Sequence, residues 1–161
     1  MDASCSAEEH FRRGEAALET DDHALALEHF RSANRLDPTR PCYRSFLGLS
    51  LGLAERRFDQ ALQLCRSAAK EEFFNPLLYH NLARVHMAFG FKAEGIRYLR
   101  RGLMIDPDNA DIDAALRVMG VRRTPPLGFL PRRHPFNRVL GSLLGHLPLG
   151  RRPLPEVGQE H

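Results

Sequence analysis

The 161-residue sequence has no tryptophan, only three cysteines and no long apolar run. Cys5, Cys42 and Cys65 form neither an even set nor a Cys-x-x-Cys pair, which is typical of proteins in a reducing compartment. No stretch reaches the roughly 18 apolar residues of a membrane-spanning helix, and the N-terminal residues MDASCSAEEH lack the pattern of a secretory signal. We therefore expect a cytoplasmic domain, and its 43% hydrophobic content allows a substantial core.

Signatures of catalysis and of metal or cofactor binding are also missing. The eight histidines include no His-x-x-x-His pair and no cluster with cysteine at zinc spacing. His80 and His86 stand six positions apart, so they point in different directions on one helix. The sequence has neither a glycine-rich phosphate loop nor a Gly-x-Ser-x-Gly motif. We expect no enzymatic activity, no metal and no cofactor.

Charge and proline divide the chain near Gly120. Residues 1–120 hold 16 Lys and Arg against 18 Asp and Glu, whereas residues 121–161 hold seven Arg against two Glu. Seven of the eleven prolines also follow residue 120. This division predicts a near-neutral body followed by a basic tail.

Small residues in the body recur with a period of 34 or 35. The matched sets are Gly14, Gly48 and Ala83; Ala26, Ala61 and Gly95; and Ala33, Ala68 and Gly102. The second unit is one residue longer than the others between its first two small residues, and we place the extra residue in the inner turn LAERRFD. A period of this length indicates a repeat protein.

Each unit predicts two antiparallel helices. Apolar residues recur three and four positions apart, as at Leu82, Val85 and Phe89, and turn residues such as Asp21 and Gly90 separate the runs. Antiparallel helices approach closely only where side chains are small, so the matched small residues have a packing role.

These residues resemble the tetratricopeptide repeat, a helix-turn-helix unit of 34 residues. Residues 76–109 fit it best, with Tyr79, Asn81, Leu82, Ala83, Gly90, Gly95, Leu99, Gly102, Asp106 and Pro107. The resemblance implies an all-α fold in which three repeats, 7–40, 41–75 (with the one-residue insertion) and 76–109, form a right-handed superhelix. We expect a disordered N-terminus at 1–6 and a capping helix at 110–120.

The resemblance also implies a concave groove lined by the first helix of each repeat. Its matching positions include Glu8, Phe11, Glu15, Leu18, Glu19, Cys42, Ser45, Leu49, Leu53, Leu77, His80, Arg84 and Met87. Phe11 and Glu15 stand where chaperone-binding members carry the Lys and Asn that clamp a carboxylate, so we expect a partly apolar or basic segment as ligand. The alternative is that Phe11, Leu49 and Met87 belong to the core, because a helix rotation of one residue would bury them.

The basic tail divides into three segments. Prolines predict an extended segment at 121–134, and residues 135–147 predict a short amphipathic helix, followed by a disordered end at 148–161. The residues expected to make contacts are Arg132, Arg133, Phe136, Leu140, Leu143 and Leu144. The apolar stripe could pack on the repeats of the same chain, on a partner protein or a second copy of the chain, or on an acidic membrane surface.

We interpret the chain as a non-enzymatic adaptor or scaffold that binds a peptide segment or a partner protein in the groove. The class II type III secretion chaperones are similar in length and repeat number, which makes a bacterial secretion chaperone the first alternative. The 21 arginines against two lysines are typical of a GC-rich, bacterial genome. A further alternative is binding of nucleic acid or an acidic membrane surface through the tail, although Phe129 and Phe136 are its only aromatic residues.

Overall fold

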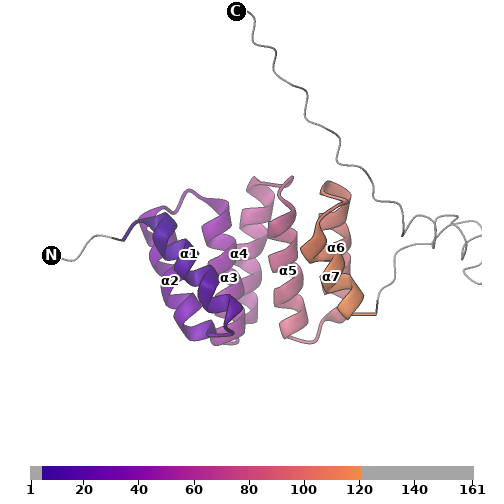
Figure 1. Cartoon of the computed structure of the whole chain (residues 1–161), viewed down its shortest axis with the longest axis horizontal. Helices are drawn as coiled ribbons and strands as arrows, with labels where there is room; N and C mark the ends of the chain where they lie inside the picture. The colour runs from indigo at the N-terminus through magenta and orange to yellow at the C-terminus, as the bar shows by residue number, and fades with distance from the viewer. Residues whose placement is uncertain (1–4, 121–161) are drawn as a thin grey trace, which may run out of the picture. The chain divides into compact units, whose positions relative to one another are not determined.

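The computed structural model describes residues 5–120, and residues 1–4 and 121–161 lie outside the described part. Within residues 5–120 the chain forms seven α-helices and no strand (Figure 1). They are α1 (Ala7–Glu19), α2 (His23–Leu36), α3 (Pro41–Ala54), α4 (Phe58–Glu71), α5 (Pro76–Ala88), α6 (Lys92–Ile105) and α7 (Ala110–Val118). The predicted all-α helical-repeat fold is confirmed. The tail residues Arg132, Arg133, Phe136, Leu140, Leu143 and Leu144 lie outside the described residues.

The helices begin at residues that either accept a hydrogen bond from a free backbone N–H group or, as proline, have no N–H group. The Ser6 hydroxyl accepts a hydrogen bond from the N–H of Glu9 at 3.1 Å, so Ser6 caps α1. Our expectation of a disordered N-terminus is therefore wrong for Ser6. Pro41 and Pro76 occupy first-turn positions of α3 and α5, where a missing N–H costs nothing.

Three turns of equal length join the helices within each pair. Each contains one residue in the left-handed region: Asp21 (φ 57°), Arg56 (φ 57°) or Gly90 (φ 83°). The extra residue of the second unit lengthens the helix before its turn, because α3 has 14 residues whereas α1 and α5 have 13.

The periodic small residues lie where paired helices approach each other. A Cβ atom added at Gly14 would lie 2.7 Å from the Phe30 ring, and one at Gly48 would lie 2.8 Å from the carbonyl oxygen of Ala61. Ala61 is completely buried. The predicted packing role of these small residues is confirmed.

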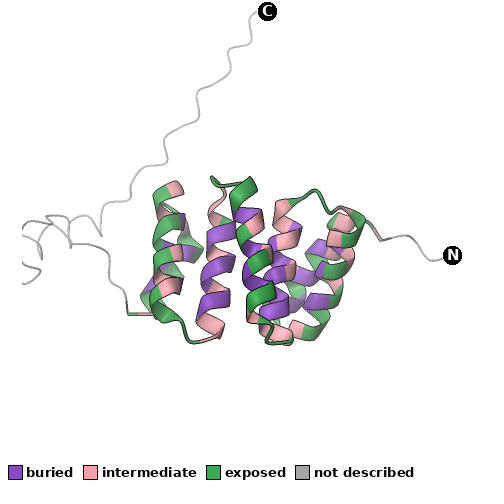
Figure 2. Ribbon diagram, turned by 180° about the vertical axis from the view of Figure 1, so that it is seen from behind, coloured by how far each residue is buried: buried purple, intermediate pink, exposed green. Residues whose placement is uncertain are grey.

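The core continues between neighbouring pairs of helices. At the first junction, the ring of Phe11 lies 5.5, 4.9 and 5.0 Å from the rings of Phe30, Tyr43 and Phe46. The middle first helices, α3 and α5, carry more buried residues than any other described helix, as Figure 2 shows for the centre of the array. A helix buried on several sides leaves only a narrow face for a ligand.

Candidate functional site

Four residues predicted to line the groove belong to the core instead. Phe11, Leu18, Ser45 and Leu49 are 9%, 8%, 0% and 0% exposed. Phe11 packs in the aromatic cluster, and the Ser45 hydroxyl accepts a hydrogen bond from the side-chain amide of Asn81 at 3.3 Å. The prediction that they contact a ligand is wrong, because these positions hold successive first helices together. Of the three residues that the alternative placed in the core, Phe11 and Leu49 are buried there, whereas Met87 is half-buried and packs against a second buried cluster.

The other predicted residues keep accessible surface. Leu77 is exposed, and His80, Arg84 and Met87 are half-buried on the same helix, α5. Their spacing of three, four and three positions places them on one side of that helix. Leu53 on α3 is also half-buried and packs against the core. We call the accessible set Glu8, Glu15, Glu19, Leu53, Leu77, His80, Arg84 and Met87 the groove face.

The α1 end of the groove face is acidic. Burial raises the pKa of Glu15, and the neighbouring carboxylates of Glu8 and Glu19 raise it further. Burial also raises the pKa of the Cys42 thiol to about 12, with additional contributions from Glu15, Glu72 and Glu8. Glu8 accepts a hydrogen bond from the Tyr43 hydroxyl at 2.8 Å.

Two features of this acidic end bear on ligand binding. Within residues 5–120, none of Glu8, Glu15 and Glu19 forms an ion pair. Glu72, which follows α4 and contributes to the raised pKa of Cys42, was not predicted to belong to this acidic end. Helix periodicity does not show which residue between two helices comes close to a third helix. The acidic end therefore has negative charge available for a positively charged ligand.

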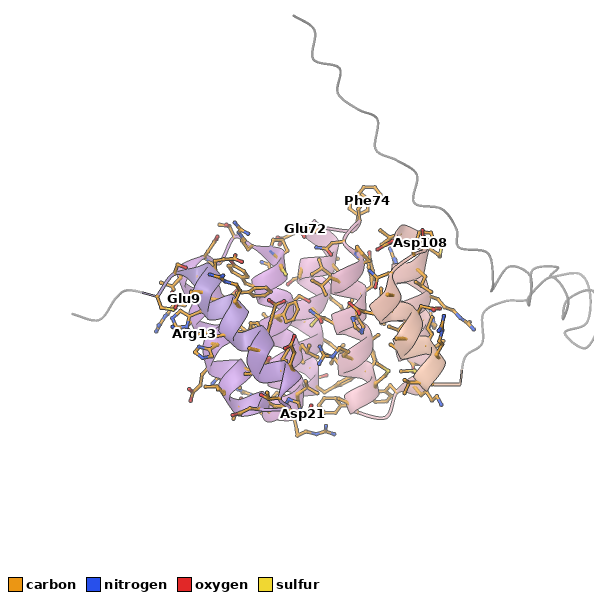
Figure 3. The ribbon with its side chains drawn as sticks, viewed as in Figure 1. Glu9, Arg13, Asp21, Glu72, Phe74 and Asp108 are labelled. Carbon is orange, nitrogen blue, oxygen red and sulfur yellow. The ribbon has the colours of Figure 1, made fainter. Side chains whose placement is uncertain are left out.

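The α5 end of the groove face carries a cation. Burial lowers the pKa of Arg84, and the carboxylate of Asp21 partly offsets this effect. Burial and the charge of Arg84 lower the pKa of His80, whereas Asp111 at the start of α7 raises it. Figure 3 shows Glu72 and Asp21 at opposite edges of the helical array. The groove face is therefore negative along α1 and positive at Arg84.

No metal centre is found within residues 5–120, because no three His, Cys, Asp or Glu side chains come together there. The cysteines Cys5, Cys42 and Cys65 are free thiols. None of the described helices is long and apolar enough to cross a bilayer.

The three helix pairs and the final helix α7 define a helical-repeat scaffold. Residues 52–118 match the family model described as Tetratricopeptide repeat. The matched segment runs from the end of α3 to α7, so this part of the chain is similar to tetratricopeptide repeat proteins. No curated protein matches the sequence significantly.

Solved structures share this fold at low sequence identity. The TPR domain of Arabidopsis OM64 is 20% identical with a TM-score of 0.55, and the alignment covers 70% of this chain and 93% of that one. The first TPR of Spaghetti (RPAP3), bound to the HSP90 peptide SRMEEVD, is 16% identical with a TM-score of 0.56, covering 71% and 93%. YrrB, described as a TPR protein with an unusual peptide-binding site, is 17% identical with a TM-score of 0.55, covering 70% and 57%.

Proposed function

We propose that the protein is a non-enzymatic adaptor whose groove face binds an extended peptide segment of a partner protein. The observation that supports this proposal most directly is the charge of the groove face. Glu15 and Glu19 form no ion pair within residues 5–120, and burial together with the carboxylates of Glu8 and Glu19 raises the pKa of Glu15. A cationic ligand would relieve that repulsion.

The charges also indicate the ligand's chemistry. A Lys or Arg side chain would lie against α1, and apolar side chains would contact Leu77 and Met87 on α5. An acidic group would fit beside Arg84, whose guanidinium has no ion-pair partner among the described residues. The peptide complex of RPAP3 and the peptide-binding site of YrrB support peptide recognition by a fold of this type.

We propose the cytoplasm as the compartment of this activity. The three thiols are free, and the Sγ of Cys65 donates a hydrogen bond to the carbonyl oxygen of Ser45 at 3.2 Å in the buried core. Free, buried thiols are typical of a reducing environment.

The test is an array of immobilised peptides of varied charge, probed with the full-length protein and with two variants. We expect the wild type to prefer peptides that combine Lys or Arg with Leu or Met. The double variant Glu15→Gln, Glu19→Gln should bind the selected peptides about threefold to tenfold more weakly, as expected for loss of partly exposed charge contacts. Glu28→Gln, at an exposed position on α2, is the matched control and should bind like the wild type.

Either of two results would contradict the proposal. One is an array in which basic and apolar peptides show no enrichment. The other is an equal loss of binding in the double variant and in Glu28→Gln, because the effect would then come from net charge rather than from the groove face.

A further inference from the structure

A second feature lies outside the groove face, in a pocket between α4, α5 and α6. Its volume is about 300 Å³, and it is lined by Arg66, His86, Glu94, Arg97, Tyr98 and Arg101. Arg66 comes from α4 and His86 from α5, whereas the other four residues come from α6. None of these residues belongs to the groove face.

The charges of the pocket are unbalanced. Three guanidinium groups face one carboxylate, and within residues 5–120 none of Arg66, Arg97 and Arg101 forms an ion pair. Arg97 and Arg101 stand four positions apart on α6, an arrangement in which like charges repel. The Cζ atom of Arg101 lies 5.0 Å from the centre of the Tyr79 ring, which places this guanidinium against an aromatic face.

His86 adds an unsatisfied polar group to the same pocket. It is 5% exposed, and neither Nδ1 nor Nε2 has a hydrogen-bond partner among the described residues. The imidazole stacks on the Tyr98 ring, with centroids 5.2 Å apart and an angle of 22° between planes. The ring of Phe91 meets it edge-on, with centroids 6.1 Å apart. A buried polar group without a partner is unfavourable, and a ligand that supplies an acceptor would satisfy the one N–H of the neutral ring.

We propose that this pocket binds a phosphate group, as inorganic phosphate or as the monoester of a small molecule. Three arginines from two helices can donate from several directions to a tetrahedral anion, whereas a carboxylate accepts in one plane. With His86 neutral, the lining has three positive charges and one negative charge, which matches a phosphate dianion. An N–H of His86 donates to the remaining oxygen.

The test follows the histidine ring signals of the full-length protein by NMR during titration with inorganic phosphate at constant ionic strength. The signal of His86 is assigned with the variant His86→Phe. We expect a saturable shift of this signal with phosphate and none with chloride or acetate. A response to acetate equal to that to phosphate, or no saturable response to phosphate, would overturn the proposal.

Variants on α6 locate the site. Arg97→Gln and Arg101→Gln should each weaken phosphate binding about tenfold or more, because each removes a charge-assisted contact. Arg100→Gln is the matched control, since Arg100 is exposed on the same helix and does not line the pocket. Equal weakening in all three variants would overturn the proposal.

Glu94→Gln provides a test that does not depend on loss of function. Removal of the single carboxylate in the pocket should strengthen phosphate binding several-fold, an effect that a purely structural role of the arginines would not produce. Weaker binding by this variant, with its fold verified by thermal unfolding, would contradict the assignment. Titration with glycerol phosphate distinguishes the two sources: tighter binding than inorganic phosphate assigns a monoester, and equal or weaker binding assigns the free anion.

Discussion

The close approach of α3 and α4 at Gly48 predicts that Gly48→Ala destabilises the protein. The added Cβ would lie 2.8 Å from both the carbonyl oxygen of Ala61 and the Sγ of Cys65, and 3.0 Å from the Cβ of Leu64. The oxygen belongs to the backbone of α4, so the two helices must separate by about 0.6 Å to restore an ordinary contact of 3.4 Å. Ala61 is completely buried, and no flexible side chain can absorb this movement.

The magnitude follows from two opposing effects. Overpacking costs about 1–3 kcal/mol, and a clash with backbone belongs at the upper end of this range. Replacement of a helical glycine by alanine returns about 1 kcal/mol through helix propensity. We therefore expect a net loss of about 1–2 kcal/mol, which lowers the melting temperature by about 4–8 °C for a domain of this size.

Gly52→Ala on the same helix is the matched control. Its Cβ would lie 3.3 Å from the Cβ of Ala61 and at least 3.6 Å from the side chains of Phe89 and Val85. It receives the same gain in helix propensity with much less crowding, so its melting temperature should equal or exceed that of the wild type. Thermal unfolding of both variants, followed by far-UV circular dichroism, makes the comparison. A Gly48→Ala protein at least as stable as Gly52→Ala would refute the helix packing described here.

Three further predictions concern backbone, thiols and pH. Gly90→Ala should lower the free energy of unfolding by about 1 kcal/mol, because Gly90 has φ 83°, a left-handed conformation that is unfavourable for alanine. Unfolding in urea measures the change in free energy. At mildly alkaline pH, iodoacetamide should modify Cys5 well before Cys65, because burial raises the pKa of Cys65 to about 12. Mass spectrometry measures the order of modification, and simultaneous labelling of the two thiols would contradict this prediction. Burial lowers the pKa of His80 and His86 in the folded state, so the unfolded chain binds more protons and stability is lost as pH falls below about 6.5. Melting temperatures in phosphate-free buffer at different pH values should show this loss, and a pH-independent value would exclude it.

The repeat architecture could be predicted because its determinants are periodic in the sequence. Gly14 and Gly48 mark close helix contacts at a spacing of 34, and the structure shows the crowding that requires small residues there. The turns at Asp21 and Gly90 were predicted for similar reasons, since both carry local turn signals.

Which of the residues predicted to line a groove are accessible could be predicted only in part. Helix periodicity identifies the side on which Ser45 and Leu49 lie, but not that the adjacent helix α5 covers that side. Their burial arises from contacts between repeats, such as that between Ser45 and Asn81, which lie 36 positions apart. The sequence spacing of one helix does not contain this information.

The pocket between α4, α5 and α6 was not predicted at all. Arg66, His86 and Arg97 come from three helices, and no motif spacing connects them. The available signal was the pair Arg97 and Arg101, two like charges on one face of a helix without an acidic residue four positions away to balance them.

The most direct test of the proposed adaptor function is to map where a peptide selected from the array contacts the full-length protein. Backbone amide shifts, followed by NMR during titration with that peptide, identify the residues affected. We predict that the largest shifts fall on the groove face, at Glu15 and Glu19 on α1 and at His80 and Arg84 on α5. Shifts confined to other surfaces, with these residues unchanged, would contradict peptide binding by the groove.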